Sequence, residues 1–136
     1  ALYQLRDFAV DRPVDARNIL MESVSPSRYF PYSATGINVT AFVIELAREG
    51  YLLQTLFQAQ QITAANSTST VHRGVHALSS VFAELYIAFC DEWVRVNPAQ
   101  GVMAFPAIFK DVKATARARY PRLASSWRRF SHVAPM

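Results

Sequence analysis

The feature that most constrains this 136-residue chain is a periodic run of large apolar residues between positions 78 and 96. Apolar side chains recur there every three or four residues, at Leu78, Phe82, Leu85, Tyr86, Phe89, Trp93 and Val96. This period is typical of an α-helix that buries one face. We therefore expect a helix at the centre of the core, ended by Asn97 and Pro98 because proline disfavours a helical conformation in the residue before it.

Three shorter helices are predicted in the first 50 residues. The first covers residues 1–10, and the second starts at Asp11 and Pro13, which have the composition of an N-capping acid and a first-turn proline. The third runs from Phe30-Pro31 to Gly50, where a left-handed glycine commonly ends a helix. The residues expected to be buried are Leu2, Leu5, Phe8 and Ala9 in the first helix, Val14, Ile19 and Leu20 in the second, and Ala34, Ile37, Ala41, Val43 or Ile44, and Leu46 in the third.

The rest of the chain continues the helical pattern. A short apolar helix is predicted over residues 52–60, followed by a small, polar loop over residues 63–70. Phe105-Pro106 starts a helix whose expected buried residues are Ile108, Phe109, Val112 and Ala116, and after Pro121 a shorter amphipathic stretch carries Leu123, Trp127 and Phe130. No alternating run is long enough to predict a strand. The expected fold is all-α, a single compact domain of about six or seven helices with no sheet.

The charge of the chain is unevenly distributed. The chain is 51% hydrophobic, which excludes a disordered tail, and its net charge is +4. Residues 1–100 contain seven arginines and nine acidic residues, whereas residues 101–136 contain seven basic residues and Asp111 alone, so their balances are −2 and +6. The sequence therefore predicts a near-neutral body with a basic C-terminal end.

The basic end is the predicted partner-binding surface. Its members are Lys110, Lys113, Arg117, Arg119, Arg128 and Arg129. A solvated helix face is the plainest interpretation, and an acidic protein or an anionic membrane surface is the functional one. Nucleic acid is the least favoured partner, because the body is acidic and no recognition motif is present.

No self-contained active site is predicted. His72 and His76 share a helical face but lack the third and fourth ligands that a zinc site needs, so no metal or cofactor is expected. Cys90 lies next to the apolar stripe and has no partner base nearby, which favours a small buried hydrophobe over a nucleophile. No signal peptide or membrane span is apparent, so a cytoplasmic protein is expected, with the cytoskeleton or a cilium as sites of association.

Three stretches of the sequence resemble the ELMO domain of the engulfment-and-motility proteins and their domain-containing relatives. Tyr29-Phe-Pro-Tyr-Ser-Ala-Thr-Gly-Ile-Asn-Val-Thr40 is similar to a run that ends in Gly/Ser-Ile-Asn-hydrophobic-Thr. The stretch from Phe82 to Asp91-Glu-Trp93 is similar to a helix that ends in an acidic residue and tryptophan, and Gln100-x-x-Met-x-Phe-Pro106 is similar to the start of the last helix. The resemblance implies an all-helical domain, with residues 1–120 as its C-terminal part and residues 121–136 as a basic extension.

Six residues of these stretches are expected to organise the fold: Gly36, Ile37, Asn38, Thr40, Trp93 and Phe105. Asn38 lies in an otherwise apolar helix and must find hydrogen-bond partners or cost about 1–3 kcal/mol. Thr40 is expected to belong to the same polar cluster, and Gly36 allows another backbone or side chain to approach closely. We therefore expect the glycine, Asn38 and Thr40 to hold one helix against its neighbours.

The resemblance also implies a role in small-GTPase regulation. Many family members activate GTP hydrolysis by Arf-like GTPases through an arginine in a motif that ends in Leu-x-x-Leu, and Leu2-Tyr-Gln-Leu5 is similar to that ending. The arginine would then precede Ala1, in a longer chain, since Arg6, Arg12 and Arg17 do not match it. Such an arginine stabilises transition-state charge and raises the rate about 10³–10⁵-fold.

Two functions follow as hypotheses. The first is a binder or regulator of Arf/Arl-type small GTPases that activates GTP hydrolysis in its full-length form. The second is a non-catalytic scaffold in a larger cytoskeletal, ciliary or membrane-associated assembly, held there through the basic end.

Overall fold

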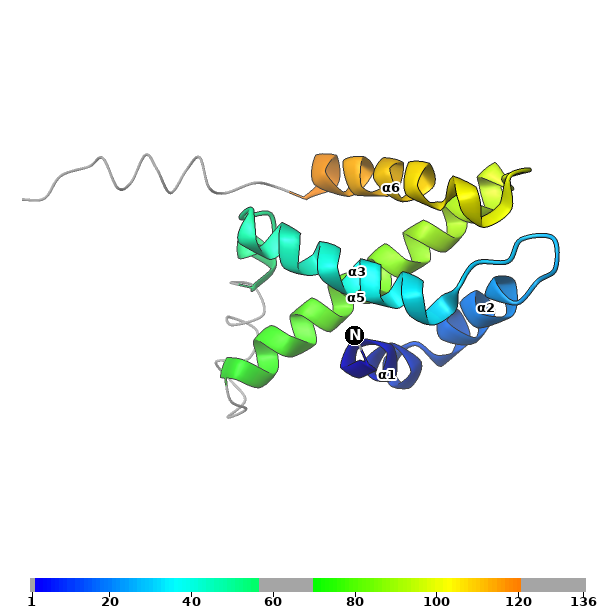
Figure 1. Cartoon of the computed structure of the whole chain (residues 1–136). Helices are drawn as coiled ribbons and strands as arrows, with labels where there is room; N and C mark the ends of the chain where they lie inside the picture. Colours follow the sequence, from blue (N-terminus) through cyan, green and yellow to red (C-terminus); the bar gives the residue numbers. More distant parts are fainter. Residues whose placement is uncertain (1, 57–69, 121–136) are drawn as a thin grey trace, which may run out of the picture.

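The computed structural model describes residues 2–56 and 70–120. In chain order the helices are α1 (Leu2–Asp11), α2 (Pro13–Ser23), α3 (Tyr32–Arg48), α5 (Thr70–Val96), the 3₁₀ turn η1 (Gly101–Ala104) and α6 (Phe105–Arg119), and residues 53–56 add a helical turn (Figure 1). No strand occurs within these ranges, so the all-α prediction is confirmed. Of the predicted loop over residues 63–70, only Thr70 is described, and it is the first residue of α5 rather than part of a loop. The end of the short helix after residue 56 and the stretch from Leu123 to Phe130 lie outside the described residues.

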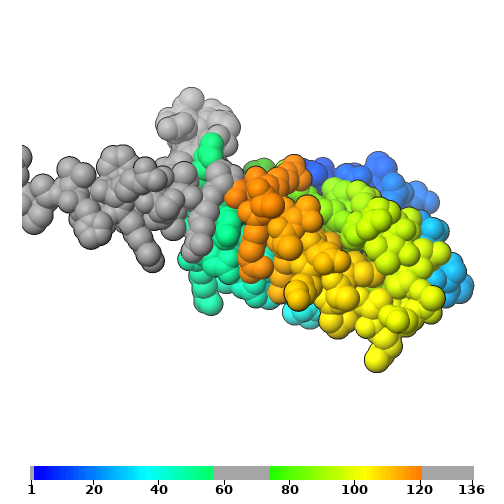
Figure 2. All heavy atoms as spheres, turned by 90° about the horizontal axis from the view of Figure 1, so that it is seen from above, coloured from blue at the N-terminus to red at the C-terminus, as the bar shows by residue number. Residues whose placement is uncertain are grey.

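The long helix α5 is the element on which the others pack. It contacts α1, α2, α3 and α6, and in Figure 1 it crosses behind α3 between α1 on one side and α6 on the other. The space-filling view shows α6 lying along α5 on one face of the molecule (Figure 2). The central position predicted for this helix is therefore confirmed.

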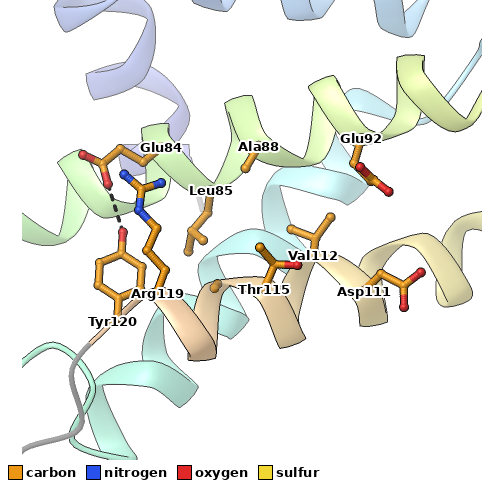
Figure 3. Close-up of a pocket in the computed structure, with 10 residues that line it drawn as sticks. Glu84, Leu85, Ala88, Glu92, Asp111, Val112, Thr115, Arg119 and Tyr120 are labelled. Atoms are coloured by element: carbon orange, nitrogen blue, oxygen red, sulfur yellow. Dashed lines mark hydrogen bonds between the residues drawn. The ribbon is translucent and has the colours of Figure 1, made fainter.

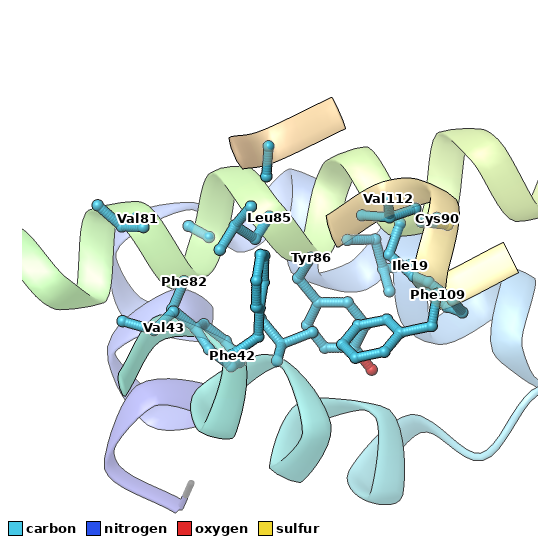
Figure 4. Close-up of a cluster of buried hydrophobic side chains, with 14 of the residues drawn as sticks. Ile19, Phe42, Val43, Val81, Phe82, Leu85, Tyr86, Cys90, Phe109 and Val112 are labelled. Carbon is cyan, nitrogen blue, oxygen red and sulfur yellow. The ribbon is translucent and has the colours of Figure 1, made fainter. Parts of the chain in front are cut away.

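The buried side of α5 is lined by aromatic rings. Phe82, Tyr86, Phe89 and Trp93 are 0% exposed. Figure 4 shows Phe82 and Tyr86 of α5 in one cluster with Phe42 and Phe109 from the flanking helices. Edge-to-face and tilted ring pairs connect them, with a centroid distance of 5.7 Å between Phe82 and Tyr86. Val96, predicted for the same stripe, is 41% exposed because it is the last residue of α5, one turn beyond Trp93.

Two polar atoms of these buried rings bind the chain that leads into α3. The Trp93 indole Nε1 donates to the carbonyl oxygen of Arg28 at 2.8 Å, and the Tyr86 hydroxyl donates to the carbonyl oxygen of Tyr32 at 2.6 Å. Buried ring donors need such partners, because an unsatisfied polar group in an apolar core is costly. The two bonds fix the start of α3 against α5.

The prediction of which residues of α3 are buried is wrong for most of them. Val43 and Leu46 are buried as expected, but Ala34, Ile37, Ala41 and Ile44 lie on the exposed side. The buried face consists instead of Thr35, Gly36, Val39, Phe42, Val43 and Leu46. The helix is apolar on both sides, and packing selects the side with the larger residues, where Phe42 meets Phe109 at a centroid distance of 6.3 Å.

In α1 and α2, too, some residues that were predicted to be buried are exposed. Phe8 and Ile19 are buried, but Leu2 is 83% and Val14 70% exposed, and Ala9 and Leu20 are also exposed. Pro13 begins α2 as predicted, whereas the N-cap residue is Arg12 and makes no side-chain capping bond. Asp11 does not cap α2 because it is still the last residue of α1.

The remaining helix boundaries follow the predictions. Gly50 has a φ of 88°, and the Tyr51 and Gly50 amides donate to the Leu46 and Ala47 carbonyls, which is a Schellman ending for α3. α5 ends before Asn97 and α6 starts at Phe105, with Ile108, Phe109, Val112 and Ala116 all buried as predicted.

We predict that Tyr86→Phe lowers the free energy of unfolding by about 1 kcal/mol at pH 7, because the Tyr32 carbonyl loses its donor. Burial raises the pKa of Tyr86 far above its ordinary value of 10.0. The parent therefore loses stability as the pH rises above about 10, where the phenol ionises only in the unfolded chain. Tyr86→Phe should show a shallower decline between pH 10 and 11 in urea unfolding. Tyr3→Phe, at a ring that is 73% exposed, is the control and should match the parent; an equal slope in all three proteins would contradict the prediction.

Candidate interaction surfaces

Gly36 lies where α3 packs against Leu5 of α1. A Cβ atom built on Gly36 would lie 3.1 Å from the Leu5 Cδ2 atom, closer than ordinary van der Waals contact. The residue therefore fits the predicted close approach, and the partner is a leucine side chain of α1. Because Leu5 belongs to the Leu2-x-x-Leu5 stretch, two of the recognised sequence motifs meet at this contact.

The two polar residues that follow Gly36 do not form one cluster. Asn38 is exposed, and its side-chain Nδ2 donates to the Ala34 carbonyl oxygen of the same helix at 2.9 Å. The hydroxyl oxygen of Thr40 is buried and has no hydrogen-bond partner among the residues that the structure describes. Residues two apart on a helix point in directions about 200° apart, so the expectation of a shared polar cluster is wrong.

The exposed side of α3 is an apolar surface, which we call the α3 outer face. Its members are Ala34, Ile37, Asn38, Ala41 and Ile44. Ile37 is 59% and Ile44 46% exposed, and helical spacing places both on the side opposite the buried Phe42. The sequence prediction missed this surface because it assigned these residues to the core. The bulk of Phe42 on the other side of the helix was the signal that could have indicated it.

Two of the predicted basic residues, Lys113 and Arg117, form ion pairs with carboxylates at the edge of the α3 outer face. The Arg117 guanidinium donates from Nε to Glu49 Oε2 at 3.1 Å and lies 3.3 Å from Glu45 Oε2 through Nη2. Lys113 Nζ lies 3.9 Å from the same Glu45 oxygen and 5.1 Å from the centroid of the Phe109 ring. These side chains of α6 therefore connect it to α3 within the domain.

The predicted basic surface is thus only partly available to a partner. Lys110 and Arg119 are exposed, while Lys113 and Arg117 are about one-third exposed and ion-paired. Arg128 and Arg129 lie outside the described residues.

A groove of about 140 Å³ lies between α5 and α6, on a different side of α6 from the ion pairs with α3 (Figure 3). Leu85, Ala88, Val112 and Ala116 contribute to its lining, and the charged residues around it are Glu84, Glu92, Asp111 and Arg119. At one end the Tyr120 hydroxyl donates to Glu84 Oε2 at 2.9 Å. Burial and this bond raise the pKa of Tyr120 above its ordinary value. We call this site the α5–α6 groove.

Trp93 and Phe105, the other two motif residues, belong to the core rather than to a surface. Trp93 is fully buried, and Phe105 is partly buried and stacks on Phe109 at a centroid distance of 5.4 Å. Both rings contact Phe89. Their place is consistent with the expected role in organising the fold.

The groups considered for chemistry show no active-site geometry. Cys90 is buried, and desolvation raises the pKa of its thiol to about 11, which disfavours the nucleophilic thiolate. His76 is exposed, and among residues 2–56 and 74–120 no three His, Cys, Asp or Glu side chains come together as metal ligands. None of the described helices is long and apolar enough to cross a membrane.

These observations define an α-helical domain with two candidate interaction surfaces, the α3 outer face and the α5–α6 groove. The model of the ELMO/CED-12 family matches residues 1–109, which is most of the chain, and the chain belongs to this family. No curated protein and no solved structure matches it. At the level of the family, the role is in small-GTPase-related signalling through protein–protein interaction. The match ends at Phe109, so Lys113, Arg117 and Tyr120 lie beyond it.

We predict that Arg117→Ala lowers the free energy of unfolding by about 1 kcal/mol, since it removes two carboxylate partners and the packing of the guanidinium over Phe42. The matched control is Arg119→Ala on the same helix, where we expect less than about 0.5 kcal/mol. Chemical denaturation in urea at low salt measures both. Equal effects of the two substitutions would show that the ion pairs with Glu45 and Glu49 do not stabilise the contact between α3 and α6.

Proposed function

We propose that this chain binds a small GTPase of the Arf/Arl type and that the α3 outer face is the contact surface. The observation that carries the proposal is the exposure of Ile37 and Asn38, which belong to the most specific of the three family stretches. Residues that served only to pack the helix would be buried. Exposed apolar side chains grouped on one surface are typical of protein–protein contacts.

The shape of the α3 outer face suits a docking helix. Ile37 and Ile44 are two turns apart, and Ala34 and Ala41 lie beside them as small residues that let a partner approach the backbone. The helix beneath is held at its start by the bonds from Trp93 and Tyr86 and at its end by Arg117. A rigid face of this kind loses little conformational entropy on binding.

The position of the outer face also supports an activating role in the full-length protein. The resemblance implies that an activating arginine precedes the Leu-x-x-Leu stretch, which corresponds to Leu2 and Leu5 here. Leu5 packs on Gly36, the residue next to Ile37. A GTPase seated on the outer face would therefore lie near the helix that follows the arginine motif. We place this activity in the cytoplasm, with the cytoskeleton or a cilium as a site of association.

The experiment measures binding of the purified chain to a panel of Arf and Arl GTPases loaded with a non-hydrolysable GTP analogue. Ile37→Glu and Ile44→Glu, made separately, should each weaken binding at least about 30-fold, as expected for a central contact residue worth about 2 kcal/mol. Both side chains are exposed, so circular dichroism and urea unfolding should match the parent. Val14→Glu, at a side chain of α2 that is 70% exposed and outside the three family stretches, is the matched control and should bind normally.

The outcomes separate the two functional hypotheses. Single-turnover hydrolysis with the full-length protein should be accelerated for the GTPase that binds, and this acceleration should be lost in Ile37→Glu. Binding without acceleration would favour the non-catalytic scaffold. Absence of binding across the whole panel, or equal binding by Ile37→Glu and the parent, would refute the proposed contact.

A further inference from the structure

The α5–α6 groove has the chemistry of a docking site for a basic, apolar segment. Its floor is formed by aliphatic side chains, including Leu85 and Val112. Three carboxylates border it, from Glu84, Glu92 and Asp111, against the single guanidinium of Arg119. Glu92 also pairs with Arg95 at the edge of α5, and Arg95 lies near Asp111 as well, so the three carboxylates exceed the two neighbouring guanidinium groups by one. We propose that residues 121–136 of this same chain bind in the α5–α6 groove.

The sequence of this C-terminal segment complements the groove in both properties. Leu123, Trp127 and Phe130 are spaced i, i+4 and i+7, so a helix over these residues would present all three on one face. Arg122, Arg128 and Arg129 supply three positive charges, and residues 121–136 contain no aspartate or glutamate. The apolar face would cover the floor while the arginines meet the carboxylates.

The connection places the segment at the mouth of the groove. α6 ends at Arg119, and Tyr120, which lines the groove, has an extended backbone with a ψ of 132°. Pro121 follows, and proline does not continue a helix from that point. The chain therefore leaves α6 at the Glu84 end of the groove, and the proposed contact requires residues 121 and 122 to turn it back between α5 and α6.

The lengths also agree. A helix over residues 123–130 would span about 11 Å, and Glu84 and Glu92 are separated by about 12 Å along α5. Because the segment is joined to Tyr120 without a linker, its effective concentration at the groove is in the millimolar range or above. Weak contacts are enough for an intramolecular complex. This contact is independent of the α3 outer face, so the proposed GTPase binding can fail without affecting it.

Quenching of Trp127 fluorescence by acrylamide in the intact chain tests the proposal. The chain has two tryptophans, and Trp93 is fully buried, so subtracting the signal of Trp127→Phe isolates the second ring. In the parent, Trp127 should be quenched severalfold less than a free tryptophan amide. Thr115→Arg adds bulk and positive charge to the groove lining at an exposed position and should raise the quenching severalfold.

The matched control is Ala114→Arg, which adds the same side chain to an exposed position of α6 that does not line the groove. It should quench like the parent, and circular dichroism should show all variants folded. Three results would each overturn the proposal: a parent Trp127 as accessible as free tryptophan, equal protection in Thr115→Arg, or protection that falls on dilution, which would indicate a second copy of the chain as the occupant.

Discussion

The packing of aromatic rings along one side of α5 is the interaction on which the rest of the domain depends. Phe82, Tyr86, Phe89 and Trp93 bury large areas, and their ring pairs reach the segment before α3 through Phe30 and α6 through Phe105 and Phe109. Apolar burial of this kind is strong but carries little directional information. The polar atoms of Trp93 and Tyr86 make the packing directional, because Trp93 binds the Arg28 carbonyl in the segment before α3 and Tyr86 binds the Tyr32 carbonyl at the start of α3.

The sequence predicted the helices of the fold better than the faces by which they pack. The period from Phe82 to Trp93 is unambiguous, since the opposite side of α5 carries residues such as Glu84 and Asp91 that resist burial. Over most of its length, α3 has no charged residues that mark one side as exposed in this way, because Ile37 and Ile44 are as apolar as Val39 and Phe42 on the opposite side. Only the neighbours decide, through the contact of Phe42 with Phe109 and of Leu5 with Gly36. The α3 outer face was therefore predicted as core, although every residue of it was correctly placed on a helix.

The predicted polar roles in α3 failed for a geometric reason. Asn38 was expected to share a polar cluster with Thr40, but an exposed asparagine can bind the carbonyl one turn back, as it does at Ala34. Gly36 was correctly linked to close approach, yet the identity of Leu5 as its neighbour depends on how α1 crosses α3. Information of this kind lies between helices that are far apart in the sequence, so no local pattern contains it.

The distribution of charge on α6 shows why the net charge of a sequence segment does not predict the charge of any one surface. Residues 101–136 have a balance of +6, which predicted one basic face. The helix instead divides its charges around its axis, because α3 and α5 lie on different sides of it. Lys113 and Arg117 turn toward the carboxylates of α3, whereas Asp111 faces the groove with Glu84 and Glu92 of α5. A basic segment thus follows directly after an acid-bordered groove. Of the seven basic residues in the total, Lys113 and Arg117 belong to an internal ion-pair network, Lys110 and Arg119 are exposed on α6, and three lie in the segment that we propose to bind the groove.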